Sequence, residues 1–146
     1  GPRSKDVAVN EAYYGAGATY DLYFDIYERN SIDNRGMSLV SYVHYDVKYD
    51  NAFWDGSEMV YGDGDGEIFA RFTKCIDVIG HELTQGVTQY EANLAYSNQP
   101  GALNESMSDV FGSLAKQRKL NRCGPFNAQN SRKGPPLYES ARDSLR

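Results

Sequence analysis

The sequence lacks any long apolar run and contains only two cysteines and two histidines. A membrane-spanning helix needs roughly 18 or more consecutive apolar residues, so no contact with a membrane is expected. Cys75 and Cys123 allow at most one disulfide, which excludes a cross-linked scaffold and leaves open whether the two cysteines pair. The polar start over residues 1–6 has no apolar core of the kind found in signal peptides.

Length and composition indicate one globular domain. The chain has 146 residues, of which 40% are hydrophobic and 13% aromatic, too many for a typical disordered protein. Residues 1–115 carry 7 basic and 18 acidic side chains, whereas residues 116–146 carry 8 and 2. The basic segment has no dense Lys/Arg run, so we expect a solvated tail and no nucleic-acid interface.

The spacing of apolar residues predicts three helices. The first spans about 7–29, and we attribute glycines near its middle, such as Gly15, to close packing against another element. A second helix is expected over about 73–89, with Thr73 as its cap, and a third over about 102–117.

Short runs of β-branched and aromatic residues predict strands over 39–45, 51–54 and 59–61. Together with the helices they indicate an α+β fold in which a small antiparallel sheet packs against the long first helix. The helical periodicity ends near residue 121 and Gly-Pro pairs follow. We therefore predict a core over 1–121 and a basic, disordered tail over 122–146.

The second predicted helix carries His81 and Glu82, followed by Gln85. In the intact zinc motif, two histidines four residues apart hold the metal from one helical face, and the intervening Glu is the base. Gln85 stands at the second histidine position. Taken alone, a His-Glu pair on a helix more often contains a structural histidine than a metal ligand. The other histidine, His44, is assigned to packing within a strand.

A second motif follows 24 residues after His81. Glu105 and Asp109 are four residues apart and therefore share a face of the third predicted helix. Glu105 can offer a carboxylate to a metal, and Asp109 can orient the imidazole of His81. The two motifs together favour a metal site over a structural histidine.

These motifs, at this separation, resemble the signature of the thermolysin family of zinc metalloendopeptidases. The resemblance covers about residues 6–121 and implies a zincin-like fold, a secreted and monomeric enzyme, and peptide or protein substrates. Within this range the resemblance is carried by the following segments: 8–13, 15–20, 51–54, 59–66 and 76–114.

By this resemblance, His81 and Glu105 would be zinc ligands, and Glu82 would take a proton from metal-bound water. Asp109 would orient His81. Zinc held by two His and one Glu keeps a fourth position for water, whose pKa falls towards 7. A carboxylate behind a ligating imidazole fixes its tautomer and raises its basicity.

The resemblance also suggests that Asn51 and the backbone of Ala52 bind an extended substrate, with Trp54 packing nearby, and that Tyr96 steadies the oxyanion. The alternatives from the residues themselves are a turn asparagine and two core aromatics.

The sequence departs from the family pattern at two positions. A neutral amide oxygen binds zinc less well than imidazole does, so Gln85 should lower the affinity for zinc by at least about 10- to 100-fold. Either the amide coordinates weakly or water fills the gap. In the family, calcium bridges an Asp equivalent to Asp77 and a Glu whose position holds Lys116 here, so an intact calcium site is not expected.

The sequence therefore predicts a zinc-dependent metalloendopeptidase that is impaired in this form, because Gln85 replaces a ligand and most of the family's helical second domain has no counterpart. The alternative is an inactive pseudopeptidase or a peptide-binding module without metal.

Overall fold

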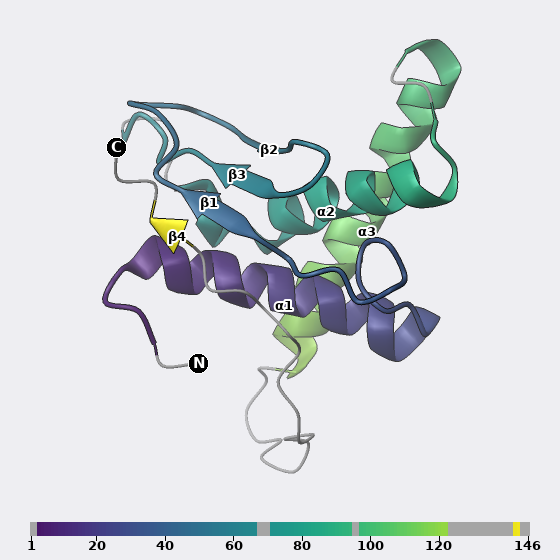
Figure 1. Cartoon of the computed structure of the whole chain (residues 1–146), viewed down its shortest axis with the longest axis horizontal. Coiled ribbons are helices and arrows are strands. Elements are labelled where there is room, and N and C mark those ends of the chain that lie inside the picture. The colour runs from purple at the N-terminus through teal and green to yellow at the C-terminus, as the bar shows by residue number, and fades with distance from the viewer. Residues whose placement is uncertain (1–2, 67–70, 95–96, 123–141, 144–146) are drawn as a thin grey trace.

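The computed structural model describes residues 3–66, 71–94, 97–122 and 142–143. In Figure 1 the long helix α1 runs alongside a small sheet, and α3 crosses the region of α1 and α2. The elements in chain order are α1 (Val7–Tyr27), β1 (Ser41–Val43), β2 (Ala52–Trp54), β3 (Met59–Tyr61), the 3-10 turn η1 (Phe72–Lys74), α2 (Ile76–Glu91), α3 (Asn98–Arg122) and β4 (Arg142–Asp143).

The sheet has the strand order β2-β3-β1-β4. The predicted α+β class is confirmed, but the sheet is mixed: only β2 and β3 pair antiparallel, and β1 runs parallel to β3 and to β4. The chain reverses between β1 and β2 and again in the β2–β3 hairpin, so β3 returns to the direction of β1. This order leaves β2 at one edge of the sheet.

The ends of the helices follow local chemistry. Asp6 caps α1, since its Oδ1 accepts hydrogen bonds from the backbone N–H of Ala8 at 2.8 Å and of Val9 at 3.5 Å. The cap predicted at Thr73 is wrong, because α2 begins at Ile76 and the Thr73 hydroxyl instead donates to Glu11 Oε2 at 2.6 Å.

Small residues let α1 pack closely on α2. Ala8, Ala12 and Ala16 are buried in one core with Ile79 of α2. A Cβ at Gly15 would lie 2.2 Å from Ile79 Cδ1, so the close packing predicted for this glycine is confirmed.

Two glycines set the crossing of α2 and α3. A Cβ at Gly112 would lie 2.4 Å from the backbone oxygen of Asp77, and one at Gly80 would lie 2.9 Å from the Gly112 Cα. The two backbones therefore approach more closely than any side chain would allow. This crossing fixes the position of the α2 residues that follow Gly80 relative to the face of α3.

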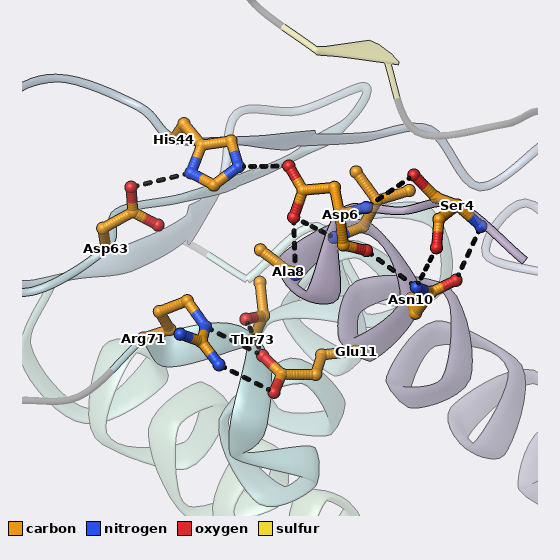
Figure 2. A network of polar contacts seen from close by, with 10 residues as sticks. Ser4, Asp6, Ala8, Asn10, Glu11, His44, Asp63, Arg71 and Thr73 are labelled. Atoms are coloured by element: carbon orange, nitrogen blue, oxygen red, sulfur yellow. Dashed lines mark hydrogen bonds and ion pairs between the residues drawn. The ribbon is translucent and has the colours of Figure 1, made fainter.

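A polar network joins the start of α1 to the sheet (Figure 2). His44 lies between two carboxylates, with Nε2 2.7 Å from Asp6 Oδ2 and Nδ1 2.7 Å from Asp63 Oδ2. These hydrogen bonds, Asp63 first, raise the pKa of His44. The assignment of His44 to packing within a strand is wrong: it follows β1, and its role is polar.

A second set of polar contacts, around Glu11, lies beside the His44 network in Figure 2. Arg71 donates to both carboxylate oxygens of Glu11 at 3.2 and 3.3 Å, next to the Thr73 hydroxyl. Burial alone would raise the pKa of Glu11, but the bonds from Arg71 and Thr73 outweigh it and the pKa is lowered. The first two turns of α1 are thus held by charged contacts.

No helix within the described ranges is long and apolar enough to cross a membrane.

Candidate active site

Two adjacent helices carry the side chains of the two sequence motifs. His81, Glu82 and Gln85 lie on α2, and Glu105 and Asp109 lie on α3. Because α2 and α3 cross closely, side chains that are 20 or more residues apart in sequence come within hydrogen-bonding distance. The structure therefore brings the two motifs together, as the spacing predicts.

The imidazole of His81 is held from α3. Its Nδ1 lies 2.8 Å from Asp109 Oδ1, and its Nε2 lies 3.3 Å from Glu105 Oε2. A carboxylate only accepts hydrogen bonds, so Nδ1 carries the hydrogen that Asp109 receives. The expected neighbours of His81 are in place, whereas their roles in catalysis stay predictions.

Gln85 lies between these two side chains. Its Nε2 is 3.0 Å from His81 Nε2 and 3.0 Å from Glu105 Oε1. One amide nitrogen therefore contacts both of the atoms that the motifs offer to a metal. The sequence interpretation left two arrangements open, a weakly coordinating amide or a water in its place, and here the amide nitrogen faces both groups.

Glu82 is directed towards the sheet. Its Oε2 accepts a hydrogen bond from the backbone N–H of Trp54 at 3.3 Å. Burial raises the pKa of Glu82 and the charge of Glu105 adds to this, while the nearby His81 and the Trp54 N–H oppose it. A carboxylate with a raised pKa holds a proton more readily than an exposed glutamate does, so Glu82 is suited to accepting and returning one.

Of the predicted substrate-binding residues, Ala52 and Trp54 lie on the edge strand β2 and Asn51 immediately precedes it. Ala52 is buried, and its N–H donates to the side-chain oxygen of the exposed Asn51 at 2.9 Å. The indole N–H of Trp54 donates to Gln89 Oε1 at 3.1 Å, next to an open pocket of about 360 Å³ that Gln85 also lines. Tyr96, the predicted oxyanion residue, lies outside the described residues.

Two family models match this chain. Residues 1–89 match the catalytic domain of thermolysin metallopeptidases, and residues 92–146 match the alpha-helical domain of the same enzymes. The first match alone covers more than half of the chain. The chain belongs to the thermolysin metallopeptidase family.

Individual members of the thermolysin family agree with this assignment. An extracellular metalloprotease of Pectobacterium carotovorum subsp. carotovorum is 55% identical over 121 residues, which cover 83% of this chain and 35% of that protein. Thermolysin of Alicyclobacillus acidocaldarius subsp. acidocaldarius is 52% identical over 113 residues, which cover 77% of this chain and 21% of that protein.

A solved structure also matches the fold. The precursor of protealysin, a metalloproteinase from Serratia proteamaculans, superposes with a TM-score of 0.81 at 58% identity, covering 83% of this chain and 38% of that chain. This chain therefore matches between 21% and 38% of the length of these relatives.

Thermolysin-family metalloproteases depend on zinc in general, but the described residues do not fit such a site. A catalytic zinc is held by three protein donors with a fourth position for water. Within the described residues, no group of three or more His, Cys, Asp or Glu side chains is arranged to hold a metal ion. His81 and Glu105 offer two donors, and the Gln85 nitrogen between them is a hydrogen-bond donor rather than a ligand.

The position predicted for a thermolysin-family calcium site holds an ion pair instead. Lys116 Nζ donates to Asp77 Oδ2 at 2.8 Å, joining α3 to α2. Burial alone would raise the pKa of Asp77, but the hydrogen bond and the charge of Lys116 outweigh it and the pKa is lowered. The ammonium group thus supplies a positive charge to the carboxylate that the prediction assigns to calcium.

Sequence reasoning missed two features of this site. The first is the crossing through Gly80 and Gly112, although a glycine inside each predicted helix is a visible signal of close backbone approach. The second is the direction of the Gln85 amide, for which no sequence signal exists because it depends on the tautomer of His81 and the position of Glu105.

Proposed function

We propose that this chain is the motif-bearing part of a thermolysin-type endopeptidase that hydrolyses peptide bonds of protein substrates outside the cell. We further propose that hydrolysis is strongly reduced in this form. The observation that carries the proposal is the convergence of His81, Glu105 and Asp109 beside Glu82, in a chain that is 55% identical over 121 residues to an extracellular metalloprotease.

Glu82 is the proposed general base. It lies one residue after His81, so it projects from α2 at a different angle and faces the Trp54 backbone. Its raised pKa lets it hold a proton at a higher pH than an exposed glutamate does. A partly buried carboxylate with a raised pKa can therefore take a proton from water and return it to a leaving amine.

His81 and Asp109 are proposed to act as a pair. The hydrogen bond to Asp109 fixes the rotation of the imidazole and directs Nε2 towards Glu105. Zinc, when bound in such a site, supplies Lewis acidity and lowers the pKa of water. Because Gln85 provides no third strong donor, we attribute the reduced activity of this chain to weak zinc binding.

The substrate is proposed to bind along β2. An extended peptide can add to an exposed sheet edge, where backbone hydrogen bonds give affinity and pockets select side chains. The order of the strands places β2 at such an edge, and Trp54 and Gln89 line the adjacent pocket. The same edge supports a second candidate function, peptide binding without hydrolysis, which needs no metal.

The test is hydrolysis of fluorescently labelled casein in the presence of zinc, by the wild-type chain, Gln85→His, and both forms with Glu82→Gln. We expect low activity in the wild-type chain, higher activity in Gln85→His, and a loss of about 100-fold or more from Glu82→Gln in either background. Hydrolysis that survives Glu82→Gln contradicts the proposal. Labelled peptide that binds all four forms without hydrolysis favours the second candidate.

A further inference from the structure

Two hydrogen-bond acceptors face each other between α2 and α3. With its hydrogen on Nδ1 for Asp109, the imidazole of His81 presents a lone pair at Nε2, and Glu105 Oε2 lies 3.3 Å away. A lone pair and a carboxylate so close repel each other unless a cation or a shared donor lies between them. The shared donor in this structure is the side chain of Gln85.

The chemistry of its neighbours fixes the orientation of the Gln85 amide. One terminal atom of this amide lies 3.0 Å from His81 Nε2 and also 3.0 Å from Glu105 Oε1. If that atom were the amide oxygen, it would face the carboxylate of Glu105 without a hydrogen between them. The NH₂ group has two hydrogens, so it satisfies both contacts, and the orientation with nitrogen inward is the favourable one.

We propose that the Gln85 amide takes the place of the metal by donating one hydrogen to His81 and one to Glu105. The site is then closed without zinc, and a zinc ion must break both hydrogen bonds to enter. Gln85 therefore acts against metal binding instead of serving as a weak ligand. The role of Gln85 rests on the proposed function, because the amide would lower the activity of the site by keeping zinc from His81 and Glu105.

The burial of the pair favours such a bridge. The His81 side chain is 17% exposed, so water competes little for its Nε2, and Glu105 is more accessible at 44%. Hydrogen bonds to a charged carboxylate are stronger than those between neutral groups. The bridge should consequently stabilise the metal-free protein as well as exclude the ion.

Substitution by leucine separates the two roles of Gln85. Leucine has a similar size and a high helix propensity, and it offers neither a hydrogen nor a ligand atom. In Gln85→Leu, zinc no longer competes with the amide, so we expect zinc to bind about 3- to 10-fold more tightly, because two hydrogen bonds of modest net strength no longer have to be broken. Without metal, the same variant should melt about 2–6 °C lower than the wild-type chain.

The measurements are zinc affinity by competition with a chromophoric chelator, and thermal unfolding in the presence of a chelator. Gln89→Leu, one turn further along α2, is the matched control and should leave zinc affinity unchanged, because Gln89 contacts Trp54 and not His81. Gln85→Glu is the second variant. It replaces the donor by a carboxylate facing Glu105, so it should also destabilise the metal-free chain and bind zinc more tightly than the wild-type chain.

Weaker zinc binding by Gln85→Leu would show that the amide oxygen is a ligand and would overturn the inference. Unchanged zinc affinity together with an unchanged melting temperature would overturn it as well. Both measurements read binding and stability instead of turnover, so the inference can fail while hydrolysis that depends on Glu82 persists. Conversely, the bridge can be correct in a chain that hydrolyses nothing.

Discussion

The two histidines of this chain are both contacted at both ring nitrogens, yet their surroundings differ. His44 has a carboxylate on each side, Asp6 and Asp63, each 2.7 Å away. His81 has the carboxylate of Asp109 at Nδ1, and at Nε2 it has the amide of Gln85 at 3.0 Å and the carboxylate of Glu105 at 3.3 Å. Two carboxylates require two donors and therefore favour the imidazolium, whereas an amide N–H requires a lone pair on the ring.

The contacts of His44 are structural, whereas His81 is proposed to take part in catalysis. The charge of His44 is matched on both sides, and the network that contains it connects α1 to the sheet (Figure 2). The lone pair of His81 is directed towards a second acidic residue, Glu105, and accepts a hydrogen bond from the Gln85 amide. The number of acidic partners does not distinguish the two; the group at the second ring nitrogen does.

The largest expected effect comes from a change at the crossing of α2 and α3, next to His81. Gly112→Ala should lower the free energy of unfolding by about 2–3 kcal/mol, because the added Cβ would lie 2.4 Å from the backbone oxygen of Asp77, which cannot rotate away. The helices must then separate, which also lengthens the contact between His81 and Asp109. Urea denaturation provides the measurement, with Ser113→Ala on the exposed side of α3 as the control. Equal stability of the two variants would show that the crossing is loose.

The His44 network should make stability depend on pH. The pKa of His44 is raised, so its contribution is complete below the ordinary value of about 6.5 and is lost as pH rises through the raised value. The hydrogen bond from His44 lowers the pKa of Asp6, so the contribution of Asp6 is lost instead as pH falls below about 4. Arg71 and Glu11, which lie beside this network, remain charged over the range between.

His44→Ala should therefore cost about 1 kcal/mol between about pH 4.5 and 6.5, a value reduced because the ring is one-third exposed, and less once the pH has risen through the raised pKa of His44. Denaturation of both forms across this pH range provides the measurement. A cost that grows towards alkaline pH would contradict the ionic account of this histidine.

The smallest expected effect concerns the Asp77–Lys116 pair. Lys116→Glu replaces the ammonium group with a second carboxylate, so the melting temperature should fall slightly in a chelator and recover when millimolar calcium is added. The wild-type chain should not respond to calcium at this position. Gln117→Glu, at the next exposed position, is the control, and a similar calcium response in this control would mean that the effect is not specific to Asp77.

Much of the arrangement could be predicted from the sequence, because it depends on local periodicity. The helical pattern starting at Val7 and the four-residue spacing of Glu105 and Asp109 are properties of single segments, and the structure contains both helices. The parallel pairing of β1 and β3 could not be predicted in this way. Strand direction depends on how the chain returns from β1 to the hairpin, which the residues of the strands do not encode.

The polar contacts were less predictable than the helices. His44 is the clearest case, since its partners are 38 and 19 residues away and come from a helix cap and a loop after β3. Gln85 is recognisable from the sequence as a departure from the zinc motif, and the sequence alone predicts a weak or absent ligand at this position. Its effect depends on the direction of one amide group between two acceptors, which only the three-dimensional arrangement specifies.

The measurement that tests the account most directly is the zinc content of the purified chain. The wild-type chain and Gln85→His are equilibrated with the same zinc solution, passed through a desalting column, and measured by elemental analysis. Replacement of the bridging amide by an imidazole should raise zinc affinity by at least about 10-fold. We therefore expect well under one zinc per wild-type chain and close to one per Gln85→His chain. One full equivalent in the wild-type chain, or equal amounts in both, would contradict the bridge between His81 and Glu105.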